Sequence, residues 1–359
     1  MSRVRPALQL LGPIAVVIVV ALIGSTVSES REIDYINALL QTTMVVAIYI
    51  FVGNSGVISF GHISFVAVGA FIAGLMTVPE LVKPTLLPEL FPVLADNTVS
   101  PFVSLLLAAG VGGLFALIVG APLMRLSGLA AGIATFAVLE ITHNLLRYWE
   151  KIGPGAKTLS LVPVTTHVRE AALGAIVAIV VAFLYQRSRG GRLLRASRED
   201  PAAAQAAGVR IHSQRLVAFV ISGAVAGLAG GLLVHALGSI TTEQVYLQLT
   251  FITLAMLVVG GMNSLWGAVV GALVVSFLDT YLSRAEDGME LGPLDVNLPD
   301  GISIVILGII MLVILILRPS GLTGGREFGI PSPRRRRGGA PPPAEPGDPM
   351  AAPATQTPA

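Results

Sequence analysis

Long apolar runs dominate this chain of 359 residues and decide what it can fold into. Most of the runs approach the roughly 20 residues that an α-helix needs to cross the apolar core of a bilayer. Charged residues make up only 12% of the chain, against about 25% in a soluble domain. We therefore predict an all-α, polytopic membrane protein with about ten transmembrane helices, at residues 7–24, 36–52, 65–78, 102–123, 129–146, 171–186, 216–237, 249–260, 265–282 and 302–317.

The positive charges of the chain orient these helices. With ten spans, sixteen of the 23 lysines and arginines fall on the side that holds the N-terminus, and seven fall on the opposite side. Lysine and arginine accumulate in cytoplasmic loops, so we predict that the N- and C-termini are both cytoplasmic. The apolar core of the first run, 7–24, is longer than that of a usual signal peptide, and we expect it to be retained as a helix.

The end of the chain differs in composition from the rest. Residues 323–359 are rich in proline, alanine and arginine and contain almost nothing to bury, so we predict a disordered cytoplasmic tail that follows a membrane domain of residues 1–322. Its four consecutive arginines, Arg334 to Arg337, could contact anionic membrane lipid at about 1 kcal/mol per charge, or could serve only to keep the tail soluble.

The longest charged segment between the apolar runs extends from Arg187 to Arg215. It contains seven arginines and only two acidic residues, Glu199 and Asp200. Asp200 suits a helix cap, Pro201 the first helical position and Gly208 the stop, which predicts a short helix at 201–207. Two interpretations remain open: a contact surface for a cytoplasmic partner, or a solvated loop that only obeys the positive-inside rule.

Polar groups inside the predicted helices are few, and they concentrate in two places. Between Gly53 and Phe65, three glycines alternate with Asn54, Ser55, Ser59 and His62, and such irregular backbone survives at membrane depth only inside protein or along a wet cavity. Glu140, His143 and Arg147, at i, i+3 and i+7, share one face of a helix. This face is either a polar strip on a translocation path or a structural cluster.

Small residues recur at a spacing of four in two predicted helices, which favours close helix packing. They are Gly223, Gly227 and Gly231 with Gly230 in one helix, and Gly267 and Gly271 in the other. A weak echo of Gly53-Asn54-Ser55 in Gly261-Met262-Asn263-Ser264 raises the hypothesis of an internal repeat.

Several chemistries are excluded or disfavoured by residue content. The chain has no cysteine and only five scattered histidines, so we expect no metal site. None of its three lysines follows a glycine, so the phosphate-binding loop G-x-x-x-x-G-K-[ST] is absent. We therefore expect no cofactor in this chain, no enzymatic activity of its own and no nucleic-acid partner.

A set of short motifs resembles the permease subunits of branched-chain amino acid ABC importers, in particular the LivM-like branch. The resemblance covers roughly residues 34–322. It is carried by Gly56-Val57-Ile58-Ser59-Phe60-Gly61-His62, Leu126-Ser127-Gly128-Leu129 with Ala134-Thr135-Phe136-Ala137 and Glu140, Arg195-Ala196-Ser197-Arg198-Glu199-Asp200, Gly260-Gly261-Met262 with Ser264-Leu265-Trp266-Gly267, and Arg318-Pro319-Ser320-Gly321-Leu322.

This resemblance implies one half of a membrane heterodimer in the bacterial inner membrane. Its partners would be a second permease subunit, two cytoplasmic ATP-binding subunits that hold ATP and Mg²⁺, and an extracytoplasmic solute-binding protein. Segment 187–215 would be the coupling loop that docks on the ATPases. The implied coupling residues are Arg195, Arg198, Glu199, Asp200, Ala203, Ala204 and Gly208, and Thr135 joins Asn54, Ser55, Ser59, His62, Glu140 and His143 as candidates for the translocation path.

The cargo is less well defined than the family. Ala130-Ala131 stands where the family often has an aromatic residue, and Gly153-Pro154-Gly155 replaces its usual Thr-Gly-Gly run. Importers of urea and short amides share this permease type, so they remain an alternative to branched-chain amino acids. An ion-coupled secondary transporter that uses residues 53–65 as a broken helix, and a purely structural membrane protein, are the competing classes.

Overall fold

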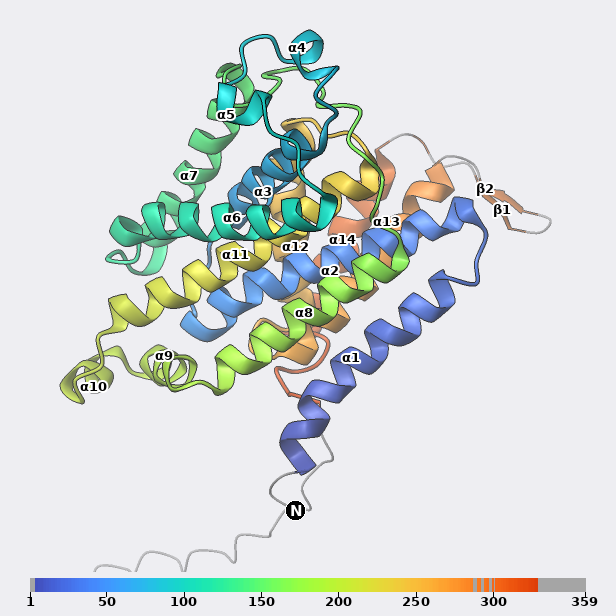
Figure 1. The fold of residues 1–359 in the computed structure, drawn as a ribbon. Helices are drawn as coiled ribbons and strands as arrows, with labels where there is room; N and C mark the ends of the chain where they lie inside the picture. The colour runs from blue at the N-terminus through green and yellow to red at the C-terminus, as the bar shows by residue number, and fades with distance from the viewer. Residues whose placement is uncertain (1–3, 287–288, 292–293, 297–298, 300, 329–359) are drawn as a thin grey trace, which may run out of the picture. The chain divides into compact units, whose positions relative to one another are not determined.

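Helices account for almost all of the regular structure in the computed structural model, which describes residues 4–286, 289–291, 294–296, 299 and 301–328 (Figure 1). The long helices are α1 (Val4–Gly24), α2 (Glu29–Ser55), α3 (His62–Thr77), α6 (Pro101–Leu123), α7 (Gly128–Tyr148), α8 (Val168–Arg187), α11 (Ile211–Leu237), α12 (Leu247–Gly260), α13 (Leu265–Glu286) and α14 (Ile302–Leu317). The shorter elements are α4 (Lys83–Leu86), α5 (Pro92–Ala95), α9 (Arg189–Glu199), α10 (Pro201–Ala206), the 3-10 turn η1 (Glu243–Val245) and the strands β1 (Met289–Leu291) and β2 (Leu294–Val296).

The predicted fold class, an all-α polytopic membrane protein, is confirmed. Within the described residues, seven helical segments are long and apolar enough to cross a membrane, and the shorter apolar helices Leu8–Gly24, His62–Thr77 and Ile302–Leu317 add three more candidates. Each of the ten predicted runs corresponds to one of the long helices. The chain is therefore a multi-pass membrane protein.

Helix α2 lies at the centre of the described domain. Its apolar window is 89% buried within the chain, and it packs against α8, α11 and α13 (Figure 1). Its first turns are polar, and the sequence predicted them as a connecting segment. They are helical in the structure, and the Asp34 carboxylate within them pairs with the Arg284 guanidinium of α13, which offsets the cost of placing charge beside the bilayer core.

Helix α11 packs between α3 and α6 at very short range. The predicted role of its glycines in helix packing is confirmed: a Cβ added at Gly227 would lie 2.3 Å from the Ala108 carbonyl oxygen, and one at Gly230 would lie 1.9 Å from the Val66 carbonyl oxygen. In α13, Gly271 is packed just as closely, with its added Cβ 2.2 Å from the Met256 carbonyl oxygen. Glycine at these positions lets helix backbones touch.

Two connecting segments contain more structure than the sequence predicted. The loop between α3 and α6 holds α4 and α5, and the Lys83 amine donates to the carbonyl oxygens of Leu94 (2.9 Å) and Asn97 (2.6 Å). Burial lowers the pKa of this amine below its usual value. The acidic loop before α14 contains the antiparallel pair β1 and β2, joined through Glu290↔Asp295.

The packed part of the chain continues beyond the predicted boundary at Leu322. The Thr323 hydroxyl donates to the Gly260 carbonyl oxygen at 2.9 Å, and the Glu327 carboxylate accepts from the Leu265 N–H (3.1 Å) and the Trp266 N–H (3.4 Å). A carboxylate at the start of α13 is stabilised by the helix dipole, although burial raises the pKa of Glu327 above its usual value. The rest of the predicted tail, including Arg334 to Arg337, lies outside the described residues.

Candidate functional site

The polar segment after α2 forms a real interruption between two helices. Helix α2 ends at Gly56, which has a left-handed conformation (φ +71°), and α3 begins only at His62. The backbone N–H of Phe60 donates to the Thr135 hydroxyl of α7 at 3.2 Å. A Cβ on Gly61 would lie 2.5 Å from the Thr135 carbonyl oxygen. Thr135 is therefore the place where α7 packs directly on this break.

The candidate residues of the break are buried within the subunit. Asn54 is fully buried and its amide donates to the Ile50 carbonyl oxygen at 2.9 Å. The His62 ring, 1% exposed, lies 2.8 Å from the Ser59 hydroxyl through Nδ1 and contacts three aromatic rings, those of Phe51, Phe65 and Phe219. Ser55 accepts from the Val57 N–H at 3.2 Å. These candidate side chains are therefore enclosed by the subunit at the break between α2 and α3.

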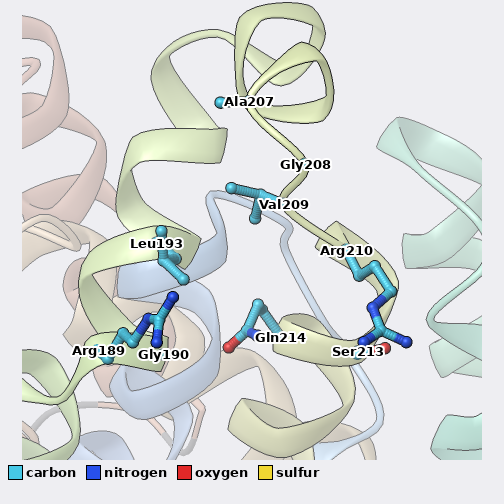
Figure 2. A pocket seen from close by; sticks show the side chains of 9 residues that line it. All are labelled: Arg189, Gly190, Leu193, Ala207, Gly208, Val209, Arg210, Ser213 and Gln214. Carbon is cyan, nitrogen blue, oxygen red and sulfur yellow. The ribbon is translucent and has the colours of Figure 1, made fainter.

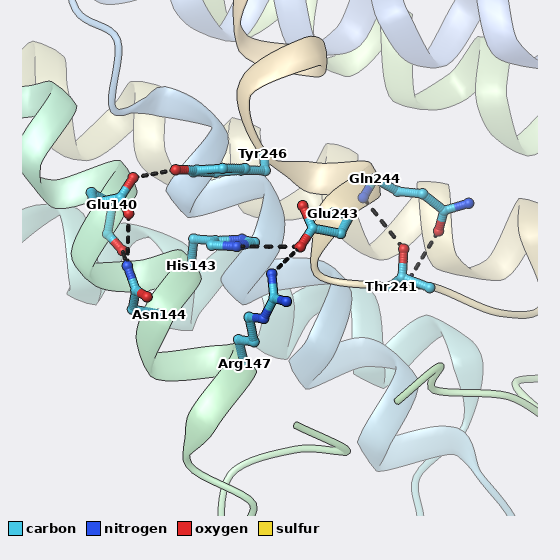
Figure 3. A network of polar contacts seen from close by, with 8 residues as sticks. All are labelled: Glu140, His143, Asn144, Arg147, Thr241, Glu243, Gln244 and Tyr246. Atoms are coloured by element: carbon cyan, nitrogen blue, oxygen red, sulfur yellow. Dashed lines mark hydrogen bonds and ion pairs between the residues drawn. The ribbon is translucent and has the colours of Figure 1, made fainter. Parts of the chain in front are cut away.

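The second group of candidates forms a polar cluster between α7 and the segment before α12 (Figure 3). The His143 ring stacks on the Tyr246 ring with centroids 3.7 Å apart, and its Nε2 lies 3.6 Å from a Glu243 carboxylate oxygen. The Tyr246 hydroxyl donates to the Glu140 carboxylate, and the Arg147 guanidinium pairs with Glu243. The shared face of α7 predicted from sequence therefore meets a second face built by Glu243 and Tyr246.

Sequence reasoning did not select Glu243 and Tyr246. The sequence nevertheless contains a signal for them. They lie three residues apart in a polar stretch before a short apolar run, so a carboxylate and a phenol can face the same helix. The cluster is only partly buried: the side chain of Glu243 is 59% exposed and that of Arg147 is 39% exposed. It therefore presents two carboxylates and one guanidinium to whatever lies beside this surface of the chain.

Glu140→Gln is expected to reduce solute uptake, because the amide keeps the size of the side chain but removes the negative charge that the Tyr246 hydroxyl and the Asn144 amide now contact. A hydrogen bond to a charged group contributes about 1.5–3 kcal/mol, so a drop of roughly tenfold or more in the rate of uptake is expected. Uptake by cells that express equal amounts of each protein measures it, with Glu150→Gln as the control, because it makes the same change at an exposed carboxylate just beyond the end of α7. Normal uptake and normal stability of Glu140→Gln would show that the position is merely tolerated.

The basic segment contains two helices, α9 and α10. The predicted short helix is confirmed at Pro201–Ala206, where the Asp200 carboxylate caps it by accepting from the Ala203 N–H at 2.9 Å. Gly208 follows with a left-handed conformation at φ +80°. Helix α9 was not predicted; the Ser188 hydroxyl caps it by accepting from the Gly191 N–H at 3.0 Å.

Some side chains of this segment are exposed, and others make contacts within the chain. Ala204 is the only buried residue of α10, while Ala203 and Glu199 are exposed. A cavity of about 590 Å³ opens between α9, the end of α10 and the start of α11, and Arg189 and Arg210 line it (Figure 2). Two of the implied coupling residues, Arg195 and Arg198, bond within this chain: Arg195 donates to the Gln186 carbonyl oxygen, and Arg198 donates to residues of α2 and the α12–α13 turn.

The described residues contain no group of three or more histidine, aspartate or glutamate side chains placed to hold a metal ion. The chain combines a polytopic helical domain, an interruption between two buried helices and an exposed capped helix between α8 and α11. These features are typical of a membrane transport subunit of the permease class.

Comparison with known proteins identifies the family. The chain belongs to the family described as "branched-chain amino acid transport system / permease component", whose model matches residues 35–315. Over 305 residues it is 26% identical to the high-affinity branched-chain amino acid transport system permease protein LivM of Escherichia coli, which covers 76% of this chain and 64% of that relative. It is thus a LivM-like ABC transporter permease.

Two further relatives show that the chain is also similar to other transport permeases. A probable branched-chain amino acid transport permease protein LivH of Methanocaldococcus jannaschii is 30% identical over 156 residues, 39% of this chain and 42% of the relative. The guanosine ABC transporter permease protein NupQ of Bacillus subtilis is 27% identical over 248 residues, 64% of this chain and 74% of the relative. The chain therefore spans less than two thirds of the length of the LivH and LivM relatives. No solved structure is significantly similar to it.

Proposed function

We propose that this chain is one permease subunit of an ATP-driven importer of branched-chain amino acids and forms half of its translocation path. The observation that carries the proposal is α10. This helix has only six residues, is capped at its start and ended by a left-handed glycine, and buries only Ala204 against its own chain. Isolated helices shorter than about 12 residues are marginal in water, so its exposed alanine face favours a partner that covers it.

The partners follow from what the chain lacks and what it exposes. Two cytoplasmic ATPases that bind ATP and Mg²⁺ would supply the absent phosphate-binding loop, and one of them would receive α10 and the nearby Arg189 and Arg210. A second permease subunit would complete the path, and an extracytoplasmic solute-binding protein would deliver the cargo. Membrane lipid surrounds the apolar faces, and we place the complex in the bacterial inner membrane.

The cargo assignment rests on the polar cluster as well as on the relatives. A free amino acid carries an ammonium group and a carboxylate, and the surface built by Glu140, Glu243 and Arg147 offers charges of both signs within one patch. Charged groups within a membrane domain usually mark a substrate pathway. The match to a guanosine permease supports nucleosides as a second candidate cargo, and urea or a short amide is a third.

Uptake of radiolabelled leucine tests the proposal. Cells that express the full chain with the proteins encoded beside it should accumulate leucine in an ATP-dependent manner, and a tag on this chain should co-purify an ATPase. Guanosine and urea serve as alternative probes. ATP-dependent uptake of guanosine without leucine would replace the cargo assignment, whereas solute uptake driven by an ion gradient without any ATPase would contradict the importer itself.

We also expect both termini to be cytoplasmic, because sixteen of the 23 lysines and arginines fall on that side when ten helices span the membrane. Reporter fusions placed after Phe328 and within residues 287–300 should then report opposite sides of the membrane. A further fusion after Leu126 should report the cytoplasm. If the first two fusions report the same side, the ten-helix topology is wrong.

A further inference from the structure

One arginine of the basic segment points into the membrane domain and joins three separate parts of it. Arg198 lies in the last turn of α9, just before Asp200, the residue that caps α10. Its Nη1 donates to the Gly53 carbonyl oxygen of α2 at 3.1 Å and to the Asn263 side-chain oxygen of the α12–α13 turn at 2.9 Å. Only 26% of the Arg198 side chain is exposed.

The aliphatic part of Arg198 is held as closely as its guanidinium. A Cβ added to Gly56, the left-handed residue that ends α2, would lie 2.5 Å from Cγ and 2.6 Å from Cδ of Arg198. The side chain therefore runs across the turn at the bare glycine before its head reaches the two acceptors. Any side chain at Gly56 would displace it.

The two acceptors lie at two helix interruptions: Gly53 is in the last turn of α2, just before the first, and Asn263 is within the second. The first lies between α2 and α3. In the second, α12 ends at Gly260, Gly261 follows at φ +117°, and α13 begins at Leu265. The interruptions also touch each other, because a Cβ on Gly53 would lie 2.8 Å from the Met262 carbonyl oxygen. Residues at helix ends are where changes in backbone angle are absorbed when elements move.

We propose that Arg198 is the positioning residue through which a displacement of α10 moves both helix interruptions, 56–61 and 261–264, together. This inference rests on the proposed function, in which a partner ATPase moves α10. Because the guanidinium is a rigid planar fork with several donors, one residue can hold acceptors on two elements in a fixed relation. In this arrangement Arg198 contacts its own membrane domain, whereas α10 and the exposed arginines contact the ATPase.

The first test uses the purified full-length chain alone. Amide hydrogen exchange in 53–61 and 260–264 should rise roughly tenfold or more in Arg198→Ala, the size expected when a hydrogen bond to a charged group is lost. Arg189→Ala is the matched control, because Arg189 lies on the same helix but lines the outer cavity. Arg198→Lys keeps the charge and should show an intermediate rise. Unchanged exchange in Arg198→Ala would overturn the inference.

The second test uses the complex purified through a tag on this chain and reconstituted in vesicles. Arg198→Ala should retain the ATPase but hydrolyse several times more ATP per leucine taken up than the wild type. Asn263→Ala should reproduce part of this change, and the double variant should add little to Arg198→Ala, as expected for residues that act as one unit. A wild-type ratio despite raised exchange would reduce Arg198 to a structural contact and overturn its coupling role. A wild-type complex that contains no ATPase would instead contradict the proposed function.

Discussion

Gly230→Ala is expected to destabilise the membrane domain by about 1–3 kcal/mol or more, the range for overpacking a tightly packed site. The added methyl carbon would lie 1.9 Å from the Val66 carbonyl oxygen and 2.8 Å from the Ala70 backbone nitrogen. Both neighbours are backbone atoms of α3, so no side chain can rotate to make room. The two helices would have to move apart.

Moving α11 away from α3 would disturb more than one contact. A Cβ on Gly69 of α3 would lie 2.1 Å from the Gly227 carbonyl oxygen, and Gly227 in turn lies against Ala108 of α6. The three helices therefore touch backbone to backbone along one stripe. Separation of α3 from α11 would remove dispersion contacts along the whole stripe, and these contacts are the main attraction between helices in lipid.

The apparent Tm of the purified protein in detergent measures this effect. Gly110→Ala is the matched control, because Gly110 lies in α6 and its added Cβ meets nothing within 4 Å. The control should be neutral or slightly stabilising, since alanine favours a helix over glycine by about 1 kcal/mol. Equal Tm values for Gly230→Ala and wild type would show that α3 and α11 have room for a methyl group between their backbones.

Most of the helices were predictable because the membrane imposes a simple requirement on sequence. Apolar runs of sufficient length must be helical to satisfy their backbone groups in lipid, and glycine and proline mark where they stop. Helix α9 escaped prediction because its arginines and the pair Gly190-Gly191 resemble a solvated loop. The helical start of α2 escaped because Asp34 finds its partner, Arg284, far along the chain.

In the candidate sites too, local patterns could be predicted from the sequence and long-range contacts could not. The common face of Glu140, His143 and Arg147 follows from helical spacing alone. Their partners do not, because Glu243 lies 96 residues after Arg147 and Tyr246 lies 106 residues after Glu140. The inward direction of Arg198 was hidden for the same reason, since Gly53 lies 145 residues before it. Sequence patterns locate a polar face, but only tertiary structure shows what that face contacts.

Gly208→Val is expected to abolish most coupled uptake while leaving the membrane domain folded. At φ +80°, Gly208 has a backbone conformation that a β-branched residue adopts only with strain. The cost for an ordinary residue is about 1–2 kcal/mol. A Cβ at this position meets nothing within 4 Å, so the strain would act on the turn between α10 and α11 rather than on core packing.

The turn can relieve this strain by changing direction, because α10 buries little against its own chain and resists weakly. A redirected α10 would no longer present its alanine face at the same angle to an ATPase. We therefore expect Gly208→Val to release the ATPase, or to leave it hydrolysing ATP without leucine uptake. The apparent Tm of the isolated chain should stay close to that of the wild type.

Two matched variants separate backbone strain from side-chain bulk. Gly208→Asn should retain much of the uptake, because asparagine tolerates the left-handed conformation better than other non-glycine residues. Ala207→Val places the same valine one residue earlier, at φ −78°, where the backbone is unstrained, and it too should transport. If Gly208→Val binds the ATPase and transports at the normal rate, α10 is not the coupling element. If Ala207→Val fails equally, bulk at the docking surface rather than the left-handed turn is what the partner rejects.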